Sequence, residues 1–174
     1  MDKKWIYIII IFIIGISALY LIVDASTVLG SGNVNLNTYT VTLPDGFNIE
    51  NNENSELSII KRNSGEKIII TDFGKISLNN PEIKKIESEL IEEINKNENT
   101  TVYDEINLTI ANKTVPCIYY ETSPGDKVNH DIFITKYNHT FIIEGMNFKD
   151  NETFKENVNF IIDNLKPDPK QKQD

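Results

Sequence analysis

The hydrophobic positions of this chain follow three different patterns, and the first is a continuous run. Residues 5–23 are apolar and uncharged over 19 positions, and Lys3 and Lys4 directly precede them. A helix of that length spans about 28 Å, close to the roughly 30 Å hydrocarbon core of a bilayer. The run therefore predicts one transmembrane helix. A cleaved signal peptide is the alternative, but its apolar region is usually only about 7 to 15 residues long.

Charges and aromatic residues around this run predict its orientation. Lys3 and Lys4 lie before it and the first basic residue after it is Lys61. Residues 1–4 are therefore expected in the cytoplasm and the chain beyond the helix outside it. The interfacial anchors expected near its two ends are Trp5, Tyr7 and Tyr20. We expect a single-pass protein of the cell membrane that contacts lipid through this helix.

The second pattern is an alternation with a period of two, which is typical of strands. Residues 38–43 alternate threonine with apolar side chains and predict a half-buried strand. Residues 56–62 and 66–73 flank a turn at 63–65 and predict a hairpin. Four further strands, joined by turns into an antiparallel meander, are predicted over residues 101–110, 114–122, 127–137 and 140–146.

The third pattern is an apolar spacing of three and four, which is typical of amphipathic helices. Asn80 can cap and Pro81 can open a helix of about 15 residues, with the apolar stripe Ile83, Ile86, Leu90, Ile91 and Ile94. A last helix begins near Asp150 or Asn151, with the stripe Phe154, Val158, Ile161, Ile162 and Leu165. The order βββ-α-ββββ-α predicts an α+β fold, in which an antiparallel β-sheet packs against the amphipathic helices.

Composition divides the chain beyond the apolar run into three parts. Residues 24–37 are small and polar and predict a flexible tether. Residues 38–166 have the length and apolar content of one domain. Residues 167–174 predict a disordered tail.

The charge balance narrows the expected partners. Beyond residue 23 the chain carries 25 acidic and 15 basic residues. Such a domain is repelled by nucleic acid and by anionic head groups, which leaves a protein of the cell envelope as the expected partner. The single cysteine, Cys117, cannot form an internal disulfide and is expected to be a buried thiol.

Five sequons raise the possibility of a glycoprotein. They begin at Asn99, Asn107, Asn112, Asn138 and Asn151, all on the side of the membrane where glycosylation can occur. The chain is rich in asparagine, so the number of sequons is close to the number expected by chance. Asn112 and Asn138 are the favoured sites because both fall in predicted turns.

A search for catalytic or metal-binding chemistry is mostly negative. The sequence contains no nucleophile elbow, dinucleotide-binding fingerprint or P-loop. The cluster that could hold a metal ion consists of Asp126, His130, Asp131 and His139. His130 and Asp131 are neighbours on a predicted strand and point to opposite faces, and His139 falls in a predicted turn. We therefore expect no metal site, no cofactor and no catalytic residue.

Two further groups of residues have a functional and a structural interpretation. The first, Glu87, Glu89, Glu92 and Glu93, lies on the polar stripe of the first helix, which favours a solvated face over an acid-base site. Tyr119 and Tyr120 point to opposite faces of a strand. One of them is expected in the core and the other on the surface, and a stacking platform for a ligand is the alternative.

Two stretches of the chain resemble the PsbP-like family. The first is Leu43-Pro44-Asp45-Gly46-Phe47 after the opening strand, and the second is FIIEGMNF followed by the helix NETFKENVNFIIDNLK. The resemblance covers residues 38–166 and implies an antiparallel sheet between helices and a non-enzymatic binding or assembly role, as in subunits that support photosystem II. This chain departs from the family by its apolar run and by Phe47, where many relatives have tryptophan. No photosynthetic role, metal site or binding residue is carried over.

Three classes of function remain open at this stage. The first is a membrane-anchored extracytoplasmic binding or assembly module without catalytic activity, which the predicted anchor, tether and acidic surface favour. The second is an envelope enzyme with a minimal carboxylate acid/base site in a cleft. The third is a pilin-like structural subunit of the cell surface, although the segment before the apolar run lacks the glycine expected at a processing site.

Overall fold

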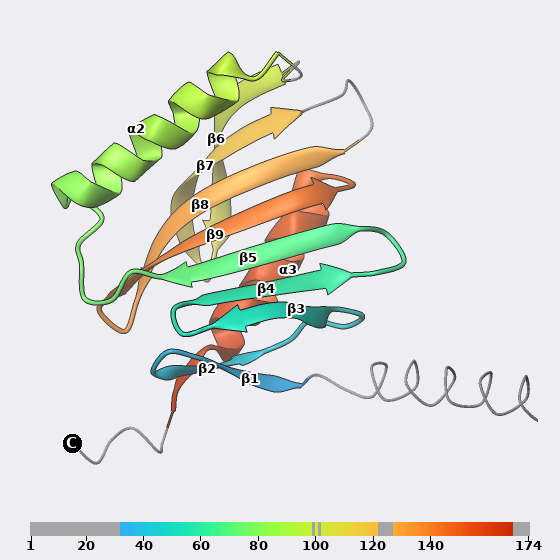
Figure 1. The fold of residues 1–174 in the computed structure, drawn as a ribbon, viewed down its shortest axis with the longest axis vertical. Helices are drawn as coiled ribbons and strands as arrows, with labels where there is room; N and C mark the ends of the chain where they lie inside the picture. The colour runs from blue at the N-terminus through green and yellow to red at the C-terminus, as the bar shows by residue number, and fades with distance from the viewer. Residues whose placement is uncertain (1–31, 99, 101, 122–126, 169–174) are drawn as a thin grey trace, which may run out of the picture. The chain divides into compact units, whose positions relative to one another are not determined.

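The computed structural model describes residues 32–98, 100, 102–121 and 127–168. A compact unit begins at Asn33 and contains two antiparallel sheets and two helices among these residues (Figure 1). The larger sheet consists, in spatial order, of β3 (Asn48–Glu53), β4 (Glu56–Lys61), β5 (Glu66–Asp72), β9 (His139–Phe148), β8 (Val128–Lys136), β7 (Lys113–Glu121) and β6 (Val102–Ile110). The smaller sheet consists of β1 (Asn33–Leu36), β2 (Tyr39–Thr42) and β10 (Lys166–Pro167).

This architecture shows that the predicted α+β fold class is wrong. The domain is mostly β, with ten strands in two antiparallel sheets and two helices among the described residues. Three strands are additions to the predicted order βββ-α-ββββ-α. β1 lies within residues 24–37, which we assigned to a tether, and β3 and β10 were also missed. β10 has only two residues and β3 is almost entirely exposed and polar, so neither carries an alternation of apolar positions. β1 alternates polar and apolar residues, but over only four positions.

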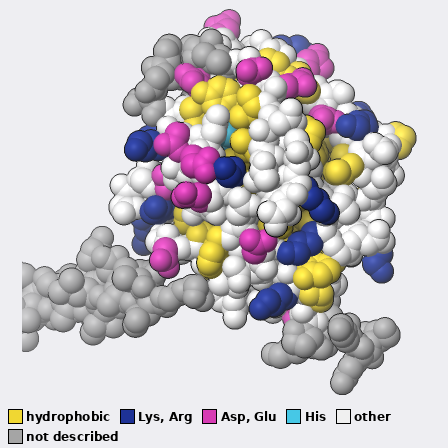
Figure 2. Space-filling view, turned by 180° about the vertical axis from the view of Figure 1, so that it is seen from behind, with side chains coloured by type: hydrophobic (Ala, Val, Ile, Leu, Met, Phe, Trp, Pro, Cys, Tyr) yellow, Lys and Arg dark blue, Asp and Glu magenta, His cyan; other side chains and the backbone are white. Residues whose placement is uncertain are grey.

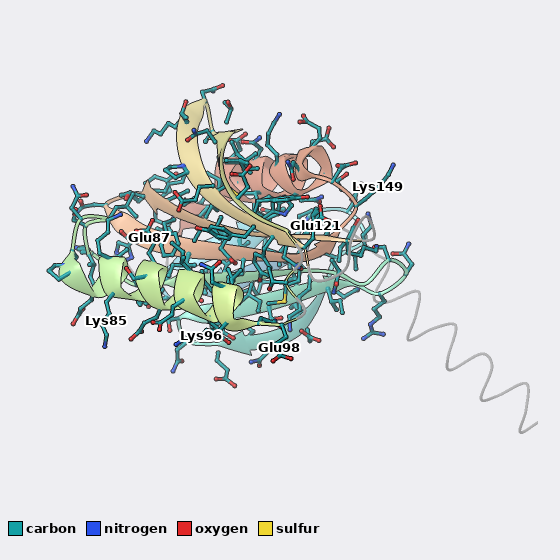
Figure 3. All side chains as sticks on the ribbon, turned by 90° about the horizontal axis from the view of Figure 1, so that it is seen from above. Lys85, Glu87, Lys96, Glu98, Glu121 and Lys149 are labelled. Atoms are coloured by element: carbon teal, nitrogen blue, oxygen red, sulfur yellow. The ribbon has the colours of Figure 1, made fainter. Side chains whose placement is uncertain are left out.

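The two helices lie on opposite faces of the larger sheet (Figures 1 and 3). α3 (Asn151–Asn164) packs on one face and fills the main core with Phe154, Val158, Ile161 and Ile162. Both sheets contribute to this core, which includes Leu36 of β1 and Phe141 of β9. α2 (Pro81–Lys96) lies over the opposite face and buries Ile83 and Ile94.

The ends of both helices agree with the sequence prediction. The Asn80 side chain caps α2 by accepting a hydrogen bond from the Glu82 N–H at 2.8 Å, and Pro81 is the first helical residue. Asp150 caps α3 by accepting from the Thr153 N–H at 2.8 Å. The predicted meander is also confirmed, because β6, β7, β8 and β9 are neighbours in sequence order.

The predicted transmembrane helix, residues 5–23, lies outside the described residues, as do its anchors Lys3, Lys4, Trp5, Tyr7 and Tyr20. Within the described part of the chain, neither helix has the length and apolar content needed to cross a membrane.

Candidate binding groove between β7 and β8

The larger sheet is split at one end between β7 and β8. The pairing of β7 with β8 begins at Cys117 and Ile132 and ends at Glu121 and Val128. The remaining residues of β7, Lys113–Pro116, pair with β6, and those of β8, Phe133–Lys136, pair with β9. Among the described residues, no cross-strand pair joins these two segments. At this end the sheet therefore consists of two separate ladders.

The β6–β7 turn determines which backbone groups of β7 face the gap. Its central residues, Ala111 and Asn112, both have positive φ, as a type I′ turn requires. The residues flanking such a turn exchange both hydrogen bonds, and hydrogen-bonded pairs then alternate with non-hydrogen-bonded pairs along the strands. On β7 the backbone groups of Thr114 and Pro116 therefore point away from β6 and toward β8.

The β8–β9 hairpin has the same geometry on the opposite wall. Its turn residues, Tyr137 and Asn138, also have positive φ, so the backbone groups of Phe133 and Thr135 point toward β7. The register of the paired region would place Phe133 opposite Pro116. Because proline has no N–H, this pair cannot exchange both hydrogen bonds, and the ladder ends there.

Contacts with α3 hold the tip of the β6–β7 hairpin away from β8. The backbone N–H of Ala111 donates to Asn159 Oδ1 at 2.7 Å, and Asn159 Nδ2 donates to the carbonyl oxygen of Thr109 at 3.4 Å. Figure 3 shows β6 and β7 rising away from the rest of the sheet on the side of α3. The hairpin is therefore fixed to the helix, and the gap beside it remains open.

The gap forms a groove with a volume of about 570 Å³. Its apolar wall includes Leu78, Ile110, Val115, Phe133, Ile134 and Ile162. Thr114 and Thr135 contribute hydroxyl groups, and the charged residues that line it are Lys113 and Lys136. Tyr137, which is 50% exposed, stands at the rim. The size and the mostly apolar lining are typical of a binding site.

Lys136 is held at the edge of this groove by the protein itself. Its ammonium group donates to the carbonyl oxygen of Ile162 and lies 5.4 Å from the centre of the Tyr137 ring. Burial lowers the pKa of Lys136, and Asp163 partly opposes this shift. Figure 2 shows several basic side chains around a hydrophobic patch at the lower right, the side on which the β8–β9 turn lies. This region is basic although the chain as a whole carries a net charge of −9.

His130, one of the predicted metal-ligand candidates, is a packing residue of the main core. Its side chain is fully buried, and its ring stacks on Phe154 with centroids 4.3 Å apart. Its Nε2 atom is 2.7 Å from Asn151 Oδ1 at the start of α3. Burial lowers the pKa of His130 to about 4, with the Asn151 hydrogen bond opposing the shift. The imidazole therefore stays neutral at physiological pH and anchors α3 to β8.

The other members of the predicted metal cluster are not brought together. His139 opens β9 rather than lying in the turn, and its Nδ1 atom is 2.9 Å from Asp72 Oδ1 on β5. The Asp72 carboxylate also accepts a hydrogen bond from Asn37 Nδ2 at 3.0 Å. Asp126 lies outside the described residues. No group of three potential metal ligands occurs in the described segments of the chain.

Asp131 forms a carboxyl pair that the sequence analysis did not identify. It lies on the face of β8 opposite to His130 and directly across from Glu144 on β9. Its side chain is 1% exposed, and Oδ2 has no hydrogen-bond partner. Burial raises the pKa of Asp131 well above its usual value, and the charge of Glu144 adds to the effect. The pKa of Glu144 is raised too, again mainly by burial.

The glutamates of α2 agree with a solvated face, whereas the prediction of one core and one surface tyrosine is wrong, because Tyr119 and Tyr120 are both half-buried. Glu87 and Glu89 form exposed ion pairs with lysines one turn away, at 2.6 Å and 3.4 Å. Glu92 and Glu93 are also exposed. Tyr119 packs against the main core, whereas Tyr120 lies on the opposite face of β7.

The sequons within the described residues all lie at exposed positions. Asn107 is on β6, and Asn112 and Asn138 are turn residues with positive φ, a conformation that asparagine tolerates well. Asn151 is exposed, but its side-chain oxygen contacts His130. Asn99 lies outside the described residues. Glycosylation of these sites stays a prediction.

Comparisons with known proteins give no family assignment. No family model matches the chain, and no curated protein matches it. A crystal structure from Bacteroides thetaiotaomicron VPI-5482 has a TM-score of 0.42 and 15% sequence identity. The match covers 75% of this chain and 45% of that chain, so this chain spans less than half the length of that protein. A likeness this distant carries no argument, and the PsbP-like resemblance stays a prediction.

Proposed function

We propose that this chain is a membrane-anchored extracytoplasmic binding or assembly module without catalytic activity. The observation that supports it best is the groove between β7 and β8. This groove is open, mostly apolar and bordered by strand ends that have no cross-strand pair between them. An exposed apolar groove of this kind marks an interaction site more often than a bare surface does. The partner binds there, and the segment 5–23 holds the domain at the membrane.

The strongest alternative is an enzyme that uses the carboxyl pair Asp131 and Glu144. Their raised pKa values are of the kind seen in catalytic acids. However, Asp131 is only 1% exposed and does not line the groove between β7 and β8. A catalytic acid must come within hydrogen-bond reach of its substrate. The position of Asp131 therefore favours a structural role.

A photo-crosslinking experiment in cells tests this proposal. A photoreactive amino acid replaces Thr135 in the groove of the full chain, and a matched variant carries it at Lys85 on the exposed side of α2. Crosslinked proteins are identified by mass spectrometry. We expect the probe at position 135 to crosslink one dominant envelope protein. The probe at position 85 should not crosslink this protein. The same set of weakly labelled proteins from both positions would contradict a binding role for the groove.

A further inference from the structure

The groove between β7 and β8 contains the backbone geometry of a missing strand. Thr114 on one wall and Thr135 on the other direct their N–H and C=O groups into the gap, as the alternation along both hairpins requires. In a continuous sheet these two residues would pair with each other, because the register of the paired region places them opposite. Here the two walls stand apart, and each presents a strand edge to the space between them.

We propose that an extended segment of a partner protein binds in this gap as an additional strand and pairs with both walls. This inference rests on the proposed binding function and specifies the class of partner. Strand addition to an exposed sheet edge is a common mode of peptide recognition. Here the peptide fills the gap between Lys113–Pro116 and Phe133–Lys136, so that the larger sheet becomes continuous at this end.

The dimensions of the groove match such a segment. Neighbouring strands of a sheet lie about 4.8 Å apart, packed layers lie about 10 Å apart, and a strand rises about 3.4 Å per residue. The product of these spacings is roughly 160 Å³ for each residue of a strand. The groove volume of about 570 Å³ therefore holds about three to four residues. The two walls, Lys113–Pro116 and Phe133–Lys136, have this same length.

Backbone chemistry favours a peptide over an acyl chain as the occupant. A hydrocarbon in the gap would cover the N–H and C=O groups of Thr114 and Thr135 without bonding to them. A buried backbone group without a hydrogen-bond partner is destabilising, whereas a strand satisfies these groups directly. The apolar side chains Val115, Ile134 and Ile162 then receive every second side chain of the bound segment.

Charge adds a requirement on the sequence of the bound segment. Among the described residues, the charged side chains that line the groove are those of Lys113 and Lys136, and no acidic residue lines it. Lys113 is exposed at the start of β7, next to the turn. A peptide with an acidic side chain or a terminal carboxylate at this end complements the groove. The expected ligand is an extended segment with alternating apolar residues and a carboxylate beside Lys113.

Selection from a random heptapeptide library on the purified full chain, wild type in sequence, provides the probes. Circular dichroism verifies that each protein used is folded. We expect enriched peptides with alternating apolar positions and an acidic residue, bound with micromolar affinity. Methylation of alternate backbone nitrogens in an enriched peptide should weaken binding at least tenfold, because it removes the N–H donors that face one wall and leaves the side chains. Methylation of the intervening nitrogens removes the donors that face the other wall and should weaken binding as well.

Two substitutions at one site provide the matched control. Thr114→Pro removes an N–H that faces the gap and leaves the β6–β7 ladder intact, whereas Thr114→Val keeps the N–H. We expect Thr114→Pro to lose peptide binding at least tenfold and Thr114→Val to retain it. Failure to enrich any peptide, equal binding to both variants, or binding of hexadecanoate in place of peptides would overturn strand addition. The crosslinking result at position 135 would still stand, so failure of this inference is distinguishable from failure of the binding function.

Discussion

At the scale of single residues, β8 carries two neighbouring ionisable side chains that are buried on opposite faces. His130 is kept neutral by burial and contacts Asn151, whereas Asp131 is buried across from Glu144 without a partner for Oδ2. An unpaired buried carboxyl group is costly when it is ionised. The ionised form of Asp131 therefore destabilises the folded domain, and the size of this effect depends on pH.

The first prediction concerns the pH dependence of this loss. Because the pKa of Asp131 is raised in the folded state, the folded state binds more protons than the unfolded state above about pH 4. The free energy of unfolding therefore falls as pH rises from about 4 through the folded pKa, by up to about 1.4 kcal/mol per pH unit. Asp131→Asn removes this contribution.

Urea unfolding of wild type and Asp131→Asn at pH 5 and pH 8 measures the effect. The variant should gain stability relative to wild type at the higher pH. His130 contributes stability that is lost as the pH falls from about 6.5 to about 4. This contribution cancels in the comparison because both proteins contain His130. The control Asp45→Asn changes an exposed aspartate and should keep the wild-type slope. Parallel pH profiles for wild type and Asp131→Asn would show that the buried carboxyl group is not destabilising.

At the scale of elements, α3 closes the main core. Ile161 is fully buried on the face of α3 that packs against the sheets, whereas Lys155 pairs with Glu152 on the outer side at 2.7 Å. Ile161→Asp places an unpaired carboxylate in the core and should lower the free energy of unfolding by several kcal/mol.

Lys155→Asp is the matched control for this prediction. It breaks a surface ion pair and places two acidic residues one turn apart, which costs no more than about 1 kcal/mol. Thermal or urea unfolding of the two variants compares them directly. Similar stability of both variants would mean that α3 is not docked through Ile161.

Elements with a strong local signal could be predicted from the sequence, and elements that depend on distant partners could not. α2 and α3 combine caps with a 3.6-residue apolar period, and the β4–β5 hairpin has alternation with a turn. β3 has one exposed isoleucine among polar residues and forms only because β4 pairs with it. β10 consists of two residues held by β2. Such strands are determined by tertiary pairing rather than by local pattern.

The groove was also missed, although one residue carried a signal for it. Pro116 stands within the alternating stretch that became β7, where a proline restricts pairing to one side of the strand. Whether it faces β6 or β8 depends on the turn at Ala111 and Asn112, and the volume of the gap depends on the contact between Ala111 and Asn159 across the fold. The sequence could therefore indicate an interruption but not its position or size.

At the scale of the whole molecule, the proposal places the domain outside the cell and holds it there by residues 5–23. Protease added to intact, wall-stripped cells should degrade the chain beyond residue 37 and leave an N-terminal fragment in the membrane fraction. Antibodies against tags at the two ends distinguish the products on a blot. Protection of the domain in intact cells, followed by degradation after lysis, would place it in the cytoplasm instead.

The central claim is that Pro116 keeps the sheet open and that the opening is the binding site. Pro116→Val supplies the missing N–H, so the β7–β8 ladder can extend through Thr114 and Thr135. The most direct measurement follows hydrogen exchange of the new amide at position 116 together with crosslinking of the partner from position 135. We predict a protected amide and loss of the crosslinked partner in a folded protein. A protected amide with undiminished crosslinking would contradict the assignment of the groove, and an exchanging amide would contradict the role of the proline.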